Sequence, residues 1–197
     1  MKDCPSDVIT DEASALPLVR CLVENGMPVA EVTLRTPAAL SSIRRMCEVP
    51  GLQVGAGTVL TVDQATAAVD AGACFLVSPG LHEDVIRYAQ SVNVPIIPGI
   101  ATPSEMARAI SLGLDLVKFF PAEALGGVRL LKAIGSVYPD VAVMPTGGIS
   151  PSNISGYLDL PNVVACGGSW MIPASELAAG DFEEIGELVR AASELTK

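Results

Sequence analysis

A lysine stands inside an apolar run that ends at a proline. Lys118 lies between Val117 and Phe119, and Pro121 favours an extended backbone at the residue before it, so the run predicts a short buried strand. An ammonium group in such surroundings is costly unless it is paired or loses its proton. The neutral amine of a lysine can attack a ketone and form a Schiff base. The alternative is that Lys118 extends from the strand end into solvent and has no chemical role.

A carboxylate and a guanidinium share one face of an earlier predicted strand. Side chains of a strand alternate with period two, so Glu31, Thr33 and Arg35 point to the same side. A straight strand holds Glu31 and Arg35 about 13 Å apart, and a direct ion pair requires the chain to bend back near Thr36. We interpret Glu31 as a candidate general acid or base and Arg35 as a clamp for a substrate carboxylate. A structural ion pair is the alternative.

Glycines gather after three of the predicted strands. The first group reads Gly55-Ala56-Gly57-Thr58, and the later two read Thr146-Gly147-Gly148 and Gly167-Gly168-Ser169. Bare backbone amides in the two later loops, beside a short helix predicted to begin near Ser169, would bind an anion such as phosphate. The alternative is that both double glycines form tight turns only.

Composition narrows the class of protein. The chain has 197 residues with 22 acids against 12 bases and a net charge of −10, which argues against nucleic acid and anionic membranes as partners. No apolar run approaches the ~20 residues of a membrane span, and the first residues lack the apolar core of a signal peptide. Five cysteines without CxxC spacing indicate reduced thiols and a cytoplasmic location. The single histidine argues against a transition-metal site, although magnesium held by carboxylates stays open.

Short apolar strands alternate with Ala-rich amphipathic helices along the whole chain. Strands are expected near residues 7–10, 29–34, 52–56, 74–77, 96–98, 116–119, 141–144 and 163–166, and helices near 12–24, 37–47, 62–71, 83–91, 104–112, 128–137, 153–158 and 182–195. This alternation predicts parallel βα units and a single α/β domain over residues 1–197, a (β/α)8 TIM barrel of about 25 residues per unit. An open doubly wound sheet is the alternative, but it would need a phosphate-binding loop after the first strand, where the chain reads Asp11-Glu12-Ala13-Ser14.

Seven motifs in the same order resemble the family of 2-keto-3-deoxy-6-phosphogluconate aldolases, some of which also act on 4-hydroxy-2-oxoglutarate. The resemblance covers residues 17–180. Its motifs are Glu31-Val32-Thr33-Leu34-Arg35-Thr36, Gly55-Ala56-Gly57-Thr58-Val59-Leu60, Ser78-Pro79-Gly80-Leu81, Ile97-Pro98-Gly99-Ile100, Lys118-Phe119-Phe120-Pro121-Ala122-Glu123, Pro145-Thr146-Gly147-Gly148-Ile149-Ser150 and Gly167-Gly168-Ser169-Trp170.

The resemblance implies a class I aldolase that needs no cofactor and acts as a homotrimer on small molecules. Lys118 would form the Schiff base and Glu31 would shuttle protons. Arg35 and Thr58 would hold the carboxylate of pyruvate, and Pro79 and Phe120 would line the pocket. The phosphate group would lie against Ser169 and the surrounding loop residues, namely Thr146, Gly147, Gly148, Gly167 and Gly168.

Three other functions stay open on the sequence. A phosphate-binding isomerase or epimerase would use Glu31 as a base without a covalent intermediate, and Lys118 would be dispensable. A binding protein on a decayed enzyme scaffold would have no activity, which the intact set of Lys118, Glu31 and Arg35 argues against. A metal-dependent pyruvate aldolase would be inhibited by a chelator.

Overall fold

The protein folds around one parallel sheet whose strands follow each other in sequence order. The computed structural model describes residues 3–7, 9 and 11–195. Within these residues eight strands are arranged in the order β7-β6-β5-β4-β3-β2-β1-β8. Their bounds are β1 Asp3–Asp7, β2 Val29–Thr33, β3 Gln53–Gly57, β4 Phe75–Ser78, β5 Ile96–Ile100, β6 Leu116–Phe119, β7 Ala142–Pro145 and β8 Cys166–Gly168.

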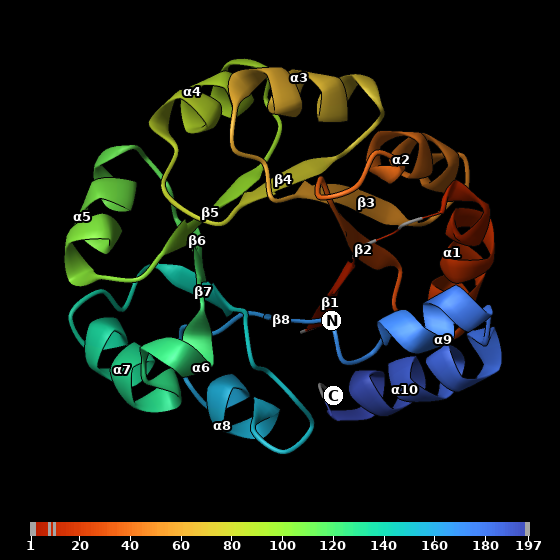
Figure 1. Cartoon of the computed structure of the whole chain (residues 1–197). Coiled ribbons are helices and arrows are strands. Elements are labelled where there is room, and N and C mark those ends of the chain that lie inside the picture. Colours follow the sequence, from red (N-terminus) through yellow and green to blue (C-terminus); the bar gives the residue numbers. More distant parts are fainter. Residues whose placement is uncertain (1–2, 8, 10, 196–197) are drawn as a thin grey trace.

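The sheet is curled, and its helices lie on the outside (Figure 1). The first and last strands of the order approach each other, because isolated parallel bridges join Val143 to Val163 and Thr146 to Gly167. The predicted α/β class with a parallel sheet is thereby confirmed. Since all the strands run in parallel, their C-terminal ends meet at one edge of the curled sheet.

The first strand was predicted too late in the chain. β1 covers Asp3–Asp7, whereas the expected strand was 7–10, of which residues 8 and 10 lie outside the described residues. The apolar pair Val8-Ile9 drew the prediction forward. Pairing on both sides fixes the actual position, since Cys4 stands opposite Gly167 of β8. Backbone hydrogen bonds on two sides stabilise a strand whose side chains are partly polar.

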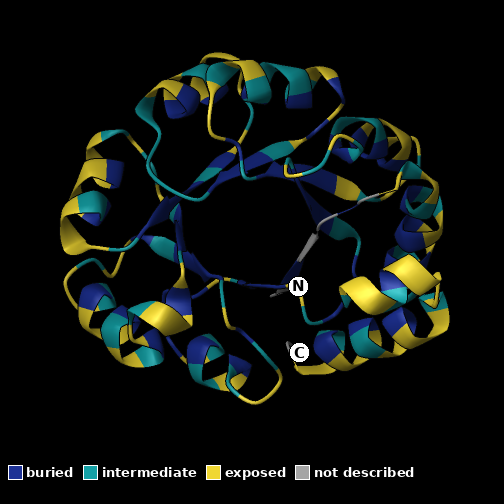
Figure 2. Cartoon of the chain, viewed as in Figure 1, coloured by how far each residue is buried: buried dark blue, intermediate teal, exposed yellow. Residues whose placement is uncertain are grey.

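Ten α-helices are present in the described residues, with a 3-10 turn η1 (Glu12–Ser14) before the first. They are α1 Ala15–Glu24, α2 Ala39–Cys47, α3 Val62–Asp70, α4 Glu83–Ser91, α5 Pro103–Ser111, α6 Ala122–Leu125, α7 Gly127–Gly135, α8 Ile154–Leu158, α9 Ala174–Ala179 and α10 Phe182–Leu195. Helix α4 is typical: Val85, Ile86 and Ala89 are buried, while Asp84 and Arg87 are exposed. The buried faces turn toward the sheet (Figure 2).

The core lies between the sheet and the helices. Val32 and Leu76 belong to one large cluster with helices α1–α4 and α10, and Val117 and Phe119 belong to a second with α5, α7 and α8. Because alternate strand residues fill this outer core, the residues between them point into the curl of the sheet. This alternation places Glu31 and Lys118 on the inside.

The helix predicted to begin near Ser169 is absent. Residues 169–172 form a turn and a bend, and α9 begins at Ala174. Proline disfavours the helical conformation in the residue before it, so Pro173 prevents a helix from running through Ile172. The loop after β8 therefore offers its own backbone groups, without the aligned amides of a helix start.

None of the helices in the described part of the chain has the length and apolar character that a membrane crossing requires.

Candidate active site

One pocket of about 300 Å³ lies where the C-terminal ends of the strands meet. All of the site residues predicted from the sequence line it. They are Glu31, Arg35, Thr58, Pro79, Lys118, Phe120, Thr146, Gly147, Gly148, Gly167, Gly168 and Ser169. Thr33 and Ile149 complete the lining. The fold thus brings residues from six strand ends, spread over more than a hundred positions of the sequence, to one place.

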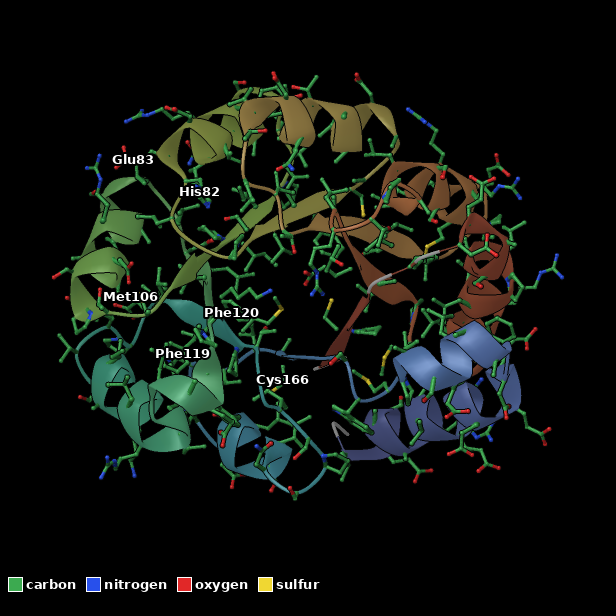
Figure 3. The ribbon with its side chains drawn as sticks, viewed as in Figure 1. His82, Glu83, Met106, Phe119, Phe120 and Cys166 are labelled. Carbon is green, nitrogen blue, oxygen red and sulfur yellow. The ribbon has the colours of Figure 1, made fainter. Side chains whose placement is uncertain are left out.

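Lys118 and Glu31 form a buried ion pair across the inside of the sheet. The ammonium nitrogen of Lys118 lies 3.7 Å from Oε1 of Glu31, and the two side chains are 8% and 1% exposed. Their strands, β6 and β2, are not neighbours in the sheet. The Lys118 nitrogen also lies 5.2 Å from the centre of the Phe120 ring. Phe120 is the first residue after β6 and lines the pocket (Figure 3). The interpretation of Lys118 as a solvent-facing strand end is wrong, because the side chain is enclosed.

Neither carboxylate oxygen of Glu31 has a hydrogen-bond partner among the described residues. Buried carboxylates are normally held by several donors, since desolvation without compensation is costly. The charge of Glu31 is offset mainly by Lys118 at 3.7 Å. The carboxylate therefore keeps its lone pairs free for a water molecule or a substrate hydroxyl.

Gly57 makes room for the Glu31 carboxylate. A Cβ atom at position 57 would lie 2.0 Å from Oε1 of Glu31, which is far inside van der Waals contact. Strands β2 and β3 pair in the sheet. The Glu31 carboxylate on β2 can therefore take its position only because residue 57 of β3 is a glycine. The sequence shows this glycine group but gives no indication that its partner is Glu31.

The guanidinium of Arg35, in the turn after β2, is oriented by the last residue of that strand. Nε of Arg35 donates a hydrogen bond to Oγ1 of Thr33 at 3.2 Å. Among the described residues no ion pair joins Arg35 to Glu31, so the structural ion pair considered from the sequence is not formed. Thr58 follows β3 with a φ of 58°, a left-handed conformation that is rare for a threonine and often found at functional sites. Both side chains line the pocket.

Both double glycines border the pocket, but only the first lies in a loop. Gly147 and Gly148 follow β7 with φ values of 98° and 82°, which only glycine adopts readily. Gly167 and Gly168 were predicted to form a loop but belong to β8 itself, and a Cβ on Gly167 would lie 2.3 Å from Oγ1 of Thr146, so β8 packs directly against the residue after β7. The buried Thr146 hydroxyl has no hydrogen-bond partner within the described chain. These groups supply polar lining to the pocket, whereas the ring of Phe120 supplies apolar lining.

A sequence comparison decides the family. The profile of the KDPG and KHG aldolases matches residues 4–188. The chain belongs to this aldolase family. Members of it are lyases, as the names of the relatives state.

Individual relatives agree with the family assignment. A 2-dehydro-3-deoxy-phosphogluconate aldolase of Pseudoalteromonas atlantica is 47% identical over 189 residues, which are 95% of this chain and 88% of that protein. A KDPG aldolase of Legionella pneumophila, solved with pyruvate captured as a covalent carbinolamine intermediate, superposes with a TM-score of 0.94 at 41% identity, covering 96% and 93% of the two chains. The Zymomonas mobilis enzyme with 3-phosphoglycerate gives a TM-score of 0.94 at 43% identity, covering 98% and 91%.

Two pocket residues of this aldolase were not predicted as site residues. Thr33 shares the inward face of β2 with Glu31, and the face that the sequence assigned to Glu31, Thr33 and Arg35 was the available indication. Ile149 follows the first double glycine and has no polar group that would mark it. Within the described residues no group of three or more His, Cys, Asp or Glu side chains is placed to hold a metal ion.

Proposed function

We propose that this protein is a class I aldolase that cleaves 2-keto-3-deoxy-6-phosphogluconate to pyruvate and glyceraldehyde 3-phosphate. The same chemistry extends to 4-hydroxy-2-oxoglutarate, which would give pyruvate and glyoxylate. The observation that carries the proposal is the enclosed Lys118 amine, 3.7 Å from a Glu31 carboxylate with unused lone pairs, inside a pocket that two double glycines line. The substrate names follow those of the relatives.

Lys118 would act as the nucleophile. The amine attacks the C2 ketone of the substrate, and loss of water gives an iminium ion. Glu31, through a bridging water, removes the proton of the C4 hydroxyl, and the C3–C4 electron pair moves into the iminium as the bond breaks. The aldehyde leaves. Glu31 then returns the proton to C3 of the enamine, and hydrolysis of the new iminium releases pyruvate and free Lys118.

The remaining pocket residues would bind the two ends of the substrate. Arg35 and Thr58 would hold the carboxylate next to the ketone, with Arg35 aimed by Thr33. Pro79 and Phe120 would form the walls of the pocket. The phosphate end would lie against the donors of the segment after β7 and of the end of β8, which are Thr146, Gly147, Gly148, Gly167, Gly168 and Ser169. The Zymomonas structure with 3-phosphoglycerate supports a phosphate-bearing ligand.

Five broader features belong to the same proposal. The curled sheet forms a closed (β/α)8 barrel, which is supported by the bridges from Val143 to Val163 and from Thr146 to Gly167, and residues 1–197 form a single domain. The protein works without a cofactor as a homotrimer, which the low charged fraction of 17% supports. It resides in the cytoplasm, where its five cysteines stay reduced.

Trapping of the imine tests the central step. The protein is incubated with pyruvate and borohydride, its intact mass is measured, and the modified peptide is mapped. We expect a reduced pyruvate adduct on Lys118 and none after Lys118→Ala. Lys132→Ala is the matched control, because Lys132 is exposed on α7 outside the pocket. A folded protein without an adduct, or a Lys118→Ala variant with wild-type turnover, would favour an isomerase that uses Glu31 alone.

A further inference from the structure

Two residues outside the pocket connect the lysine strand to the first double-glycine loop. Glu123 lies on α6, which follows Lys118 and β6 directly, and Tyr157 lies on α8, which follows the loop of Gly147 and Gly148. The hydroxyl of Tyr157 donates a short hydrogen bond to Oε1 of Glu123. Neither side chain lines the pocket. A role in the reaction must therefore act through the residues that they hold.

The glycine loop rests on Glu123. A Cβ at Gly148 would lie 2.7 Å from both Cβ and Cγ of Glu123, so the stem of this side chain is in direct contact with the loop backbone. The backbone N–H of Glu123 donates to the carbonyl oxygen of Gly147 at 3.1 Å, and that of Ala122 donates to Thr146 at 2.8 Å. The segment after Lys118 and the loop are thus joined at consecutive residues.

Helix α8 holds the same loop from the other side. Nδ2 of Asn153 donates to the carbonyl oxygen of Gly148 at 2.9 Å, and Oδ1 of Asn153 accepts from the backbone N–H of Ser150 at 2.8 Å. The Tyr157 side chain is fully buried one turn further along. Burial, together with the hydrogen bond to Glu123, raises the pKa of Tyr157, so the phenol stays a donor at all physiological pH values.

We propose that Glu123 and Tyr157 are positioning residues that fix the Gly147-Gly148 loop relative to Lys118 and so set the affinity for the phosphate end of the ligand. Glu123 is an exposed residue, and its carboxylate is held by the hydrogen bond from Tyr157. Without the Tyr157 hydroxyl the carboxylate is free to turn outward, and the stem of Glu123 that contacts Gly148 moves with it. The identity of the ligand rests on the proposed function, whereas the link between the two helices does not.

The test compares binding at the two ends of the pocket. Tyr157→Phe keeps the buried ring and removes the hydrogen bond. We expect its Kd for glycerol 3-phosphate, measured by titration calorimetry, to rise about fivefold, while pyruvate trapping at Lys118 stays at the wild-type level. Glu123→Ala is expected to match it, and Glu123→Gln, which keeps an acceptor for the phenol, to stay near wild type. Tyr138→Phe is the control, because that hydroxyl donates to Pro103 at the surface.

The outcomes separate the two proposals. An unchanged Kd in a folded Tyr157→Phe variant overturns the positioning role, and so does an equal loss of phosphate binding and pyruvate trapping, since this would indicate general damage to the fold. A wild-type protein that traps pyruvate but does not bind glycerol 3-phosphate overturns the positioning role alone. A wild-type protein that binds glycerol 3-phosphate but does not trap pyruvate overturns the aldolase proposal, and the Kd comparison still decides the positioning role.

Discussion

The ammonium nitrogen of Lys118 lies 3.7 Å from Oε1 of Glu31 in a part of the fold that water hardly reaches. The distance favours both charges by mutual attraction but is too long for a hydrogen bond. Glu31 is therefore held near the amine by sheet geometry and by the space that Gly57 leaves, and not by a network of donors. A carboxylate held in this way can exchange protons with a ligand without first breaking its own hydrogen bonds.

Replacing the carboxylate should separate imine formation from proton transfer. In Glu31→Gln the side chain keeps its size but cannot accept a proton, so we expect turnover of the phosphorylated substrate to fall about 10²–10⁴-fold. The borohydride-trapped pyruvate adduct on Lys118 should still form. Steady-state assays and intact mass on the same preparation give both values. Turnover near the wild-type rate would exclude Glu31 as the proton shuttle.

A methyl group on Gly57 should displace the same carboxylate. In Gly57→Ala the added carbon would lie 2.0 Å from Oε1 of Glu31, so the side chain must move. We expect the free energy of unfolding to fall by about 1–3 kcal/mol, as for other overpacked sites, with a loss of turnover. Gly156→Ala is the matched control, because its Cβ would meet Val128 at an ordinary 3.5 Å. Denaturant melts and activity that agree between the two variants would contradict the steric requirement.

Removing the hydroxyl of Thr33 should affect substrate binding more than chemistry. Thr33→Val deletes the acceptor that lies 3.2 Å from Nε of Arg35, so the guanidinium loses one constraint on its orientation. We expect the KM to rise about threefold to tenfold, because a typical hydrogen bond contributes about 0.5–1.5 kcal/mol net, with kcat within about twofold. The measurement is a steady-state titration with substrate. A fall in kcat at constant KM would show instead that Thr33 acts on the transition state.

Trp170 should report on the phosphate end of the pocket. It is the single tryptophan of the chain, and its indole Nε1 lies 3.0 Å from the place that a Cβ on Gly168 would occupy. A ligand that binds against Gly167 and Gly168 at the end of β8 changes the surroundings of this ring. We expect a saturable change in intrinsic fluorescence with glycerol 3-phosphate and a smaller change with pyruvate. A flat titration at concentrations where calorimetry detects binding would place the ligand elsewhere.

An exposed ion pair between α4 and α5 gives a prediction on pH. Arg108 donates to both oxygens of Glu83 at 2.7 Å on the outer surface, where Figure 3 labels Glu83. These hydrogen bonds lower the pKa of Glu83 from its usual 4.5. A lowered pKa stabilises the fold above the unfolded-state value and ceases to do so as the pH falls through the folded-state value. We expect Glu83→Gln to lower the Tm by about 1–2 °C at pH 7, because exposed pairs contribute little, and this difference to shrink as the pH falls below 4.5. A Tm difference that stays constant as the pH falls would contradict the assignment to charge.

Much of the site could be predicted from the sequence because its residues break the pattern of their strands. Lys118 and Glu31 are charged residues within apolar runs, and the double glycines stand where the strands end. Residues that act through others carry no such mark. Thr33 fits a strand face in any protein, and the hydrogen bond between Tyr157 and Glu123 joins helices that are not adjacent in the chain.

The fold was predictable to the extent that its elements are long. Helices α4 and α10 begin and end at the expected residues. Helix α6 has only four residues, too few for a helical period to show. The position of β1 depends on its pairing with β2 and β8, which no local pattern encodes. The helix expected at Ser169 is absent because Pro173 disfavours a helical conformation at Ile172.

The order of the strands also has a consequence for synthesis on the ribosome. Glu31 emerges early, Lys118 in the second half and Ser169 near the end, yet all three line one pocket. No N-terminal fragment that stops before β8 contains the complete pocket. The amine that would become the nucleophile is therefore made well before the walls that select its ligand. Each nascent chain remains chemically incomplete until β8 and Ser169 have been translated.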